Sequence, residues 1–329
     1  MVSITKHRLD ELLQNVKTKR IAVIGDVMID RYIWGNVNRI SPEAPVPVVE
    51  VESESSRLGG AANVANNIVA LGASAQLIGI VGNDFSGKEF CSILEEQKAS
   101  IQGIIIDPSR PTTVKTRVIA HHQHVVRIDS EEKRDIGQDI QQKIFSVLEK
   151  NIDSIDGIII EDYNKGVVVK DLIHAIIELA NQKRKIITID PKLNNFFEYK
   201  NVTVFKPNKK ETEEALGKKL RSDTDVIAAG KILIEKLQAD NILLTRSEKG
   251  MSLFEKNGTV THIPTNARKV ADVSGAGDTV IATLTAMLSA GAKISEAALL
   301  ANYAGGIVCG EVGIITIDPA ILRSTIFEL

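Results

Sequence analysis

The segment from Asp272 to Asp278 has the residue types and the spacing of an anion-binding turn that ends in a carboxylate. It reads DVSGAGD and leads directly into TVIATLTAMLSAG, an apolar stretch that predicts a helix. Gly275, Ala276 and Gly277 leave backbone N–H groups uncovered at the start of this helix, where those donors and the helix dipole favour a phosphoryl group. Asp278, in the first turn, is placed to accept a proton from a hydroxyl as a catalytic general base. An ordinary glycine turn, with an acidic residue that complements the dipole, remains the alternative.

A second group of polar residues lies near the N-terminus and suits the recognition of a polyol. Asp26 follows the run RIAVIG directly, Asp30 comes soon after it, and Gly59 and Gly60 open a helical pattern that contains Asn63. Ligands of open α/β sheets bind beyond the carboxyl ends of the strands. We therefore expect Asp26, Asp30 and Asn63 to meet there and to bind sugar hydroxyls, although each residue alone is more often a cap or turn residue.

The elements that position these groups are short apolar runs that alternate with helical patterns. The runs are RIAVIG, AQLIGIVG, GIIIED, KIITID, VTVFKPN and NILLTRS. Such alternation predicts parallel strands joined by crossover helices. We expect an α/β fold of the doubly wound class, with helices on both faces of a mostly parallel sheet.

Two segments interrupt the alternation, because neither has a helix between its strands. Residues 32–51 contain three prolines, and residues 112–129 place TVKTRVIA and HVVRID on either side of a polar HHQ turn, which predicts a β-hairpin. We expect both segments to leave the main sheet and to form a small β lid. Without an internal repeat or a linker, the chain predicts a single domain over residues 1–329.

With these motifs the sequence resembles the pfkB or ribokinase-like carbohydrate kinases, and the resemblance extends over essentially the whole chain. GGAANVANNIVALGA and DVSGAGDTVIATL match the two signatures of that family. The resemblance implies a ribokinase-like fold, ATP as the phosphoryl donor and Asp278 as the catalytic base. It also implies that Gly59, Gly60 and Asn63 contact the sugar.

The same resemblance implies nucleotide and metal sites. Asn208 and Glu211 in KPNKKE match an N-x-x-E element that organises Mg²⁺ and phosphate, and Mg²⁺ keeps several waters and needs few protein ligands. Without the resemblance this segment predicts only a helix N-cap. A monovalent cation near Asp272 occurs in parts of the family, and the sequence does not decide that point. The residues expected at the nucleotide are Asp190, Lys192, Asn208, Thr245, Ser247, Glu248, Gly250, Gly275, Gly277 and Asn302.

A narrower resemblance within the family concerns the substrate. GDVMIDRYIWG, RISPEAPVPVVEV, DYNKG, IDPK and TRSEKGMSLF are similar to the kinase half of the enzymes that make ADP-heptose for the lipopolysaccharide core. This resemblance implies phosphorylation of the anomeric hydroxyl of D-glycero-D-manno-heptose 7-phosphate to the 1,7-bisphosphate. The alternatives are a ribokinase-like kinase of another sugar or a nucleoside, and a non-catalytic sugar-binding relative.

The adenylyltransferase half of those enzymes carries an H-x-G-H motif that does not occur in this sequence. We therefore expect a monofunctional kinase without an adenylyltransferase domain. Another polypeptide would then carry out the adenylyl transfer.

A substrate that already carries a phosphate needs cations near the reacting hydroxyl. We expect Arg39, Lys115, Arg117, Arg127 and Lys165 to supply them, because they lie in or near the lid segments and a guanidinium binds a phosphate dianion through two hydrogen bonds. Lys115 and Arg117 are two residues apart, so they lie on one face of their strand. A solvated hairpin face is the alternative, and for Arg127 the two interpretations are equally supported.

The bulk composition limits the partners of the chain. Its 329 residues carry a formal net charge of -2, which gives no general attraction for nucleic acid or anionic lipid. The apolar stretches are far shorter than the roughly 20 residues that span a bilayer, and Cys91 and Cys309 form neither a disulfide framework nor a zinc motif. We expect a cytoplasmic protein that binds a sugar phosphate and ATP, but no nucleic acid and no membrane. The edge strands of the lid suggest a homodimer.

Overall fold

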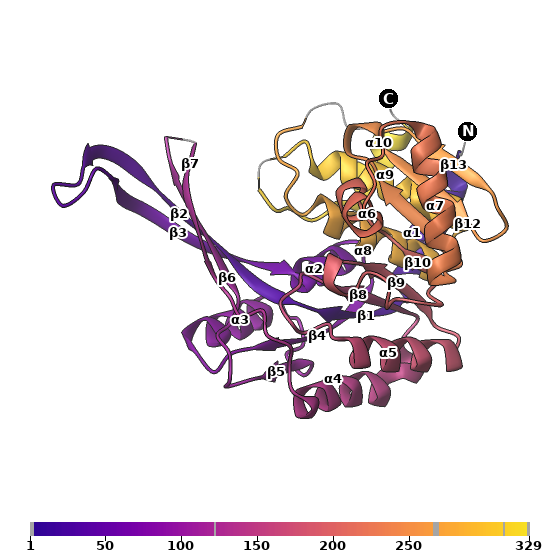
Figure 1. The fold of residues 1–329 in the computed structure, drawn as a ribbon, viewed down its shortest axis with the longest axis horizontal. Helices are drawn as coiled ribbons and strands as arrows, with labels where there is room; N and C mark the ends of the chain where they lie inside the picture. Colours follow the sequence, from indigo (N-terminus) through magenta and orange to yellow (C-terminus); the bar gives the residue numbers. More distant parts are fainter. Residues whose placement is uncertain (1–2, 122, 266–269, 312, 328–329) are drawn as a thin grey trace.

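A computed structural model describes residues 3–121, 123–265, 270–311 and 313–327, which fold around a nine-stranded sheet (Figure 1). The strand order is β13-β12-β11-β10-β9-β8-β1-β4-β5. The seven neighbouring strands β11, β10, β9, β8, β1, β4 and β5 pair in parallel. At the β11 edge, β12 and β13 add two antiparallel strands. The strands are β1 (Arg20–Gly25), β4 (Ser74–Val81), β5 (Ile104–Ile106), β8 (Gly157–Glu161), β9 (Ile186–Asp190), β10 (Val204–Phe205), β11 (Asn241–Thr245), β12 (Met251–Glu255) and β13 (Val260–Ile263).

Helices cover both faces of this sheet and bury its side chains in two separate cores. In β1, Ile21 and Val23 face one core and Ala22 and Ile24 face the other, which is why the central strands are continuous apolar runs. The first core holds α1 (Lys6–Val16), α2 (Ala61–Ala70), α3 (Phe85–Glu96), α8 (Ala276–Ser289), α9 (Ile294–Val308) and α10 (Pro319–Phe327). The second holds α4 (Gln138–Asn151), α5 (Lys170–Gln182), α6 (Lys209–Leu216) and α7 (Asp223–Leu237).

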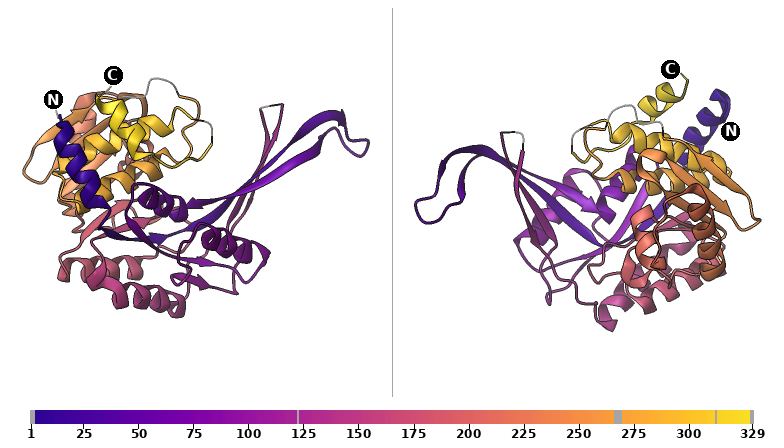
Figure 2. Two further views of the ribbon diagram at one scale, coloured as in Figure 1. Left: turned by 180° about the vertical axis from the view of Figure 1, so that it is seen from behind. Right: turned by 45° about the horizontal axis from the view of Figure 1, so that its top comes forward.

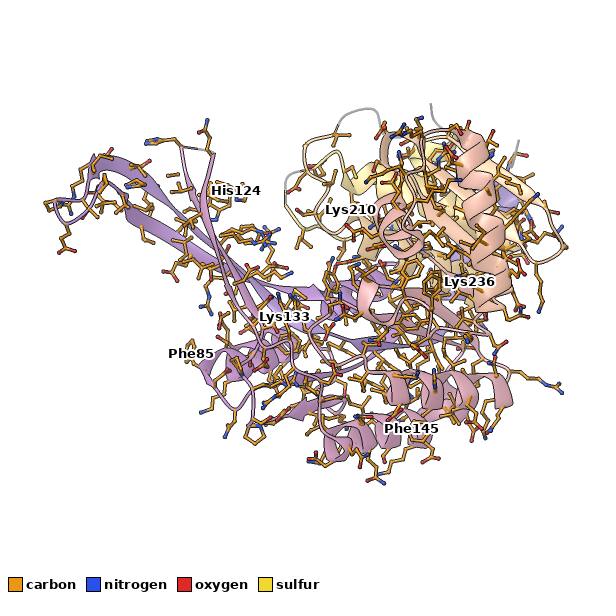
Figure 3. All side chains as sticks on the ribbon, viewed as in Figure 1. Phe85, His124, Lys133, Phe145, Lys210 and Lys236 are labelled. Atoms are coloured by element: carbon orange, nitrogen blue, oxygen red, sulfur yellow. The ribbon has the colours of Figure 1, made fainter. Side chains whose placement is uncertain are left out.

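A second sheet of four strands projects from the body as a long arm (Figures 1 and 2). Its order is β3-β2-β6-β7, with bounds β2 (Val27–Ile40), β3 (Pro47–Gly60), β6 (Val114–Ala120) and β7 (Gln123–Ser130). We call this sheet the lid. Figure 3 shows His124 of β7 on the projecting part of the lid, well away from the main sheet. Within the described residues, the lid contacts the body at the base of its strands, near the end of β1, the start of α2 and α3.

The predicted doubly wound fold with a β lid is confirmed, and the structure differs mainly in the extent of the lid. The first lid hairpin begins at Val27 and ends at Gly60, well beyond the predicted residues 32–51, because its apolar base is buried against the body. The antiparallel pair β12 and β13 was not predicted.

The two ends of the described chain lie side by side on the body, where α1 and α10 are joined by an ion pair of 2.6 Å between Asp10 and Arg323 (Figure 1). Among the helices within the described ranges, none has the length and the apolar character needed to cross a membrane.

Candidate active site

Asp278 lies in the first turn of α8 and is held by two other elements. Asn63 of α2 donates to its Oδ2 and the hydroxyl of Tyr163 donates to its Oδ1, each at 2.7 Å. The residue is 4 % exposed. Burial raises the pKa of Asp278 to about 6, although the hydrogen bonds from Asn63 and Tyr163 act to lower it. This carboxylate is fixed in orientation and ionised at neutral pH, as a general base must be.

The turn before Asp278 has the backbone that the sequence predicts. Gly275 is the N-cap of α8 with φ of 78°, and a Cβ at this position would approach the Asn63 amide to 3.0 Å. A side chain here would therefore both strain the backbone and disturb the amide that holds Asp278. A Cβ at Gly277 would lie 3.6 Å from the Asp190 carboxylate and 3.8 Å from the Lys206 ammonium. The N-terminus of α8 thus opens toward a buried charged cluster.

That cluster consists of carboxylates at the ends of three neighbouring elements. Glu161, Asp190 and Asp278 each offer an oxygen within 4.8 Å of the others. Burial, followed by the charges of Asp190 and Asp278, raises the pKa of Glu161 well above its usual range. Neither Glu161 oxygen has a hydrogen-bond partner within the described part of the chain.

Two lysines balance part of this negative charge. Lys206 is buried and lies 2.8 Å from Asp190, and Lys192 lies 3.8 Å from the same carboxylate. Although burial opposes it, Asp190 raises the pKa of Lys206, so this lysine stays an ammonium.

Asp26 lies at the same strand ends, but its carboxylate is hydrogen-bonded to backbone N–H groups of a neighbouring loop. It is 1 % exposed and accepts hydrogen bonds from the backbone N–H groups of Tyr163, Lys165 and Val167. Burial, and then the charge of Asp162, raises the pKa of Asp26 to about 6. In this structure Asp26 anchors the loop that carries Tyr163, and a direct contact with sugar hydroxyls stays a prediction.

The strand register gathers charged side chains on one face of the lid. Asp30 on β2 lies between Arg57 on β3 and Lys115 on β6. Two residues further along β2, Tyr32 is opposite Arg117 on β6, and Arg117 is opposite Arg127 on β7. Directly opposed residues of neighbouring strands point to the same side, so these residues share a face. Lys115 lies 5.4 Å from the ring of Tyr163, so this face is turned toward Asp278. We call it the cationic lid face.

The predicted phosphate-binding cations are only partly brought together. Arg117 forms an ion pair with Asp30, and its guanidinium also lies 5.4 Å from the ring of Tyr32. Lys165 is close to the cationic lid face and pairs with Glu131 at 2.6 Å. Arg127 is exposed and pairs with Asp129 of its own strand at 2.9 Å. Arg39 lies near the far end of β2, 3.9 Å from Glu50, and the structure does not bring it to the others.

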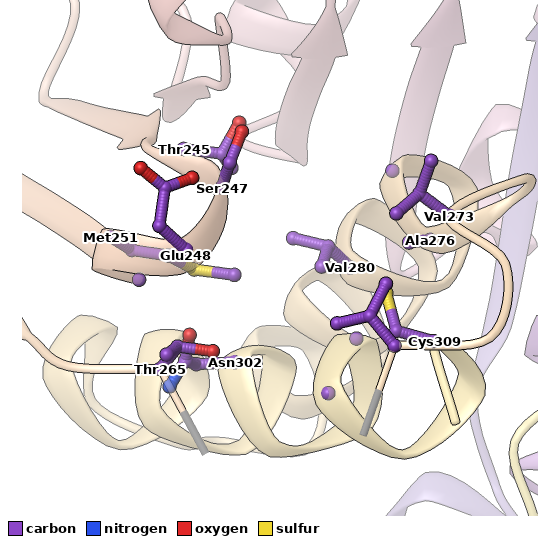
Figure 4. A pocket seen from close by; sticks show the side chains of 15 residues that line it. Thr245, Ser247, Glu248, Met251, Thr265, Val273, Ala276, Val280, Asn302 and Cys309 are labelled. Carbon is purple, nitrogen blue, oxygen red and sulfur yellow. The ribbon is translucent and has the colours of Figure 1, made fainter. Parts of the chain in front are cut away.

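Most residues expected at the nucleotide line one cavity of about 430 Å³ between β11, α8 and α9 (Figure 4). Its lining comes from the loop after β11, the start of β12, the segments before α8, and from α8 and α9. Apolar groups such as Val280 and Met251 form its walls. Gly277 lines this cavity and also lies beside Asp190 and Lys206, so the cavity adjoins the charged cluster. Asp190, Lys192, Asn208 and Gly275 lie outside the lining. The expected residues within it are Thr245, Ser247, Glu248, Gly250, Gly277 and Asn302.

The N-x-x-E element forms the N-terminus of α6. Asn208 is its N-cap: the side chain of Asn208 accepts from the Glu211 backbone N–H, and the Glu211 carboxylate accepts from the Asn208 backbone N–H. Glu211 also pairs with Lys192 at 2.8 Å. The helix cap that the bare sequence predicts is therefore present, and Lys192 links it to Asp190.

Four residues of this region were not expected from the sequence. Tyr163 and Glu161 lie within the motifs GIIIED and DYNKG, but their contacts with Asp278 bring together segments more than 100 residues apart. Lys206 directly follows β10 and appeared only as part of a strand. Arg57 lies outside the predicted lid segment, which ends at residue 51. A register drawn through to Gly60 would have placed Arg57 opposite Asp30.

This combination of fold and site defines a class of protein. A doubly wound sheet with a β lid, a buried carboxylate at a glycine-capped helix N-terminus and an adjoining cavity are the features of a ribokinase-like sugar kinase. The profile of the "pfkB family carbohydrate kinase" matches residues 18–321. The chain belongs to this family and is a sugar kinase, a phosphotransferase.

Two relatives are similar in sequence to most of this chain. The "Bifunctional protein HldE" of Geobacter sulfurreducens is 42 % identical over 315 residues, which is 96 % of this chain and 64 % of that protein. The protein of the same name from Helicobacter pylori is 45 % identical over 295 residues, 90 % of this chain and 64 % of that protein. The chain thus spans a little under two thirds of the length of these relatives.

Solved structures share the fold. Phosphofructokinase-2 from Escherichia coli, solved with potassium, superposes with a TM-score of 0.74 at 17 % identity, covering 94 % of this chain and 98 % of that one. Ribokinase from Arabidopsis thaliana, solved with ribose and ATP, gives a TM-score of 0.73 at 15 % identity, with 94 % and 98 % covered. At these identities the likeness shows the fold alone.

Proposed function

We propose that the protein transfers the γ-phosphoryl group of ATP to the anomeric hydroxyl of D-glycero-D-manno-heptose 7-phosphate, which gives the 1,7-bisphosphate for ADP-heptose synthesis. The relatives named HldE and the motif RISPEAPVPVVEV support the heptose class. The observation that carries the proposal is the cationic lid face, which turns toward a buried carboxylate at a helix N-terminus. Such a face suits a sugar that already bears a phosphate.

The chemistry follows from the positions of the residues. Asp278 accepts the proton of the sugar hydroxyl, whose oxygen attacks the γ-phosphorus while the bond to the ADP oxygen breaks. Backbone N–H groups at the start of α8 stabilise the negative charge on the phosphoryl oxygens. Lys206 and Lys192, beside Asp190, add positive charge next to the same helix end. The proton then leaves Asp278 for solvent.

Residues beside this helix end suit a magnesium ion that arrives with ATP. The unpartnered oxygens of Glu161 lie beside Asp190, and Mg²⁺ needs only one or two carboxylates because it keeps several waters. Glu161 and Asp190 would hold it, with Asn208 and Glu211 organising its waters as the family resemblance implies. When bound, Mg²⁺ supplies charge neutralisation for the phosphates. We also propose that a monovalent cation, like the potassium solved with the Escherichia coli protein, binds near Asp272.

The test is an ATP-consumption assay over sugar phosphates and free sugars. We expect kcat/KM for heptose 7-phosphate to exceed that for the unphosphorylated heptose at least tenfold, because even one charge-assisted hydrogen bond contributes about 1.5 to 3 kcal/mol. Equal values for the two sugars would exclude the phosphate-binding lid. A different preferred sugar phosphate would keep the lid and change the substrate.

One observation favours a second candidate, a kinase of a free sugar or nucleoside. Arg117 already has an ionic partner in Asp30, so its charge is balanced without a substrate phosphate. The same assay decides between the two, because this candidate requires an unphosphorylated sugar to react as well as or better than its phosphate.

Exposed apolar side chains on the outer side of the lid favour a homodimer. Val126 and Ile128 alternate with Arg127 along β7, so they point away from the cationic lid face, and they are 48 % and 56 % exposed. We propose that two lids pack through these apolar side chains and cover their edge strands. Light scattering should give twice the chain mass at assay concentration, and an Ile128→Lys variant should shift toward the monomer. A fully active wild-type monomer would contradict this assembly.

A further inference from the structure

Tyr163 makes a contact with the base that the mechanism above does not use. Its hydroxyl lies 2.7 Å from Oδ1 of Asp278, and its backbone N–H is held by the buried Asp26 carboxylate at 2.7 Å. The loop that carries it is therefore fixed at its root. An ionised carboxylate can only accept a hydrogen bond, so the Tyr163 hydroxyl is the donor in this contact.

We propose that Tyr163 is a positioning residue whose hydroxyl holds the Asp278 carboxylate in the orientation that accepts the proton of the sugar hydroxyl. This inference rests on the proposed function of Asp278 as the base. Asn63 and Tyr163 bind different oxygens of the carboxylate, so together they fix its rotation about the side-chain bond. Each carboxylate oxygen has two lone pairs, and one on each remains for the substrate.

The ring of Tyr163 is itself held by cations from two sides of the site. The ammonium of Lys115, on the lid, lies 5.4 Å from the ring centroid, and that of Lys192 lies 5.3 Å from it. Both distances are in the range of cation–π attraction. Tyr163 thus links the cationic lid face, the Lys192 side of the charged cluster and the base. A phenylalanine at this position would keep the ring contacts and remove only the hydrogen bond.

The experiment compares Tyr163→Phe with Tyr199→Phe. Tyr199 is a matched control, because its hydroxyl also donates to a buried carboxylate at 2.7 Å, that of Asp162, but does not touch Asp278. We expect Tyr163→Phe to lower kcat about 10- to 100-fold, the range of one hydrogen bond to a charged group, with KM for ATP and for the sugar phosphate within about twofold. Tyr199→Phe should lower the melting temperature to a similar degree and leave kcat within about threefold of wild type.

The outcomes separate this inference from the function on which it rests. Asp278→Asn, measured in the same assay, tests the base: an active Asp278→Asn enzyme would overturn the proposed function whatever Tyr163 does. An inactive Asp278→Asn enzyme with a fully active Tyr163→Phe enzyme would overturn the positioning role alone. If Tyr163→Phe raised KM at constant kcat, the hydroxyl would contact the substrate and not position the base. If both tyrosine variants lost kcat equally, the effect would be merely structural. Either outcome contradicts the proposal.

Discussion

The charged groups at the strand ends and the exposed ones on the cationic lid face have different kinds of partner. Asp278, Asp190 and Lys206 are 3 to 5 % exposed. Asp278 is held by Asn63, 215 residues away in the chain, and Asp190 and Lys206 pair with each other from the ends of neighbouring strands. On the lid, Arg127 is 59 % exposed and pairs with a residue two positions away on its own strand. A buried charge that loses its partner is strongly destabilising, whereas an exposed pair contributes about 0 to 1 kcal/mol.

This difference assigns different tasks to the two regions. The strand ends form a fixed scaffold in which the proposed base, Asp278, and the proposed anion-binding turn are already oriented before substrate arrives. Groups oriented in advance are a main source of rate enhancement in enzymes. The exposed lid pair of Arg127 with Asp129 is inexpensive to break. The pair of Arg117 with Asp30 is largely buried, but a guanidinium has five N–H donors, so under the proposed function Arg117 binds the substrate phosphate while it keeps Asp30 as a partner. Substitutions at the strand ends should therefore change kcat, and substitutions on the lid should change KM.

The largest effect should come from the base. We expect Asp278→Asn to lower kcat about 10²- to 10⁴-fold, because an amide cannot accept the proton, while ATP binding and the fold persist. Steady-state kinetics and a separate nucleotide-binding measurement distinguish the two effects.

Asp139→Asn is a suitable control for that variant. Asp139 also lies in the first turn of a helix, α4, and complements its dipole, but its side chain is 73 % exposed. Its activity should match wild type. An Asp278→Asn enzyme within tenfold of wild-type kcat would remove Asp278 from the role of base.

The next effect concerns the lid. Arg117→Ala should raise KM for the sugar phosphate about tenfold or more and change KM for ATP little, because one charge-assisted contact with the phosphate is lost. Arg117→Lys should recover part of the loss, since an ammonium cannot reproduce the guanidinium fork.

Arg31→Ala provides the matched control on the lid. Arg31 pairs with Glu89 at 2.5 Å, and because it alternates with Asp30 and Tyr32 it points to the opposite face. An equal rise in KM for Arg31→Ala would mean that any lost lid pair disturbs binding, which would contradict a specific phosphate site.

The same contrast explains what the sequence alone could predict of the fold. The central strands were identifiable because strands buried on both faces are continuous apolar runs. β5, with three residues, and the antiparallel pair β12 and β13 carry too weak a pattern for that method. The start of the lid was placed at Tyr32 rather than at Val27 because an apolar strand base looks the same whether it belongs to the main sheet or leaves it.

The sequence predicts candidate site residues that lie close together in one motif. It does not predict contacts that depend on strand pairing or on packing between distant segments. Gly275, Gly277 and Asp278 lie in one motif. The strand-end rule grouped Asn63 with Asp26 and Asp30 but did not predict its hydrogen bond to Asp278. Tyr163 could not be found in this way, because its partner is 115 residues away in the chain. Arg57 required the pairing of β2 with β3, which no local pattern gives.

The smallest effect expected is a pH dependence that acts on the two regions separately. Asp278 must be ionised to accept a proton, and burial raises its pKa to about 6, so kcat should fall as the pH drops through 6 and be about tenfold lower at pH 5. The second ionisation of a phosphate monoester also lies near pH 6. Its protonation weakens the contact with Arg117, so KM for the sugar phosphate should rise over the same range.

The titration of Asp26 and Asp278 does not destabilise the fold at low pH, so it does not mimic the expected fall in kcat. The folded-state pKa values of Asp26 and Asp278 lie above the unfolded value of 3.8, so their contribution to stability is present below 3.8 and is lost as the pH rises through about 6. Through these groups, acidification from pH 7 to pH 5 favours the folded state, and the melting temperature over this range shows whether the rest of the protein follows. In Arg117→Ala the fall in kcat should persist while the rise in KM becomes smaller. If kcat of the wild type stayed constant down to pH 5 with an intact fold, the proton would be accepted by a group other than Asp278.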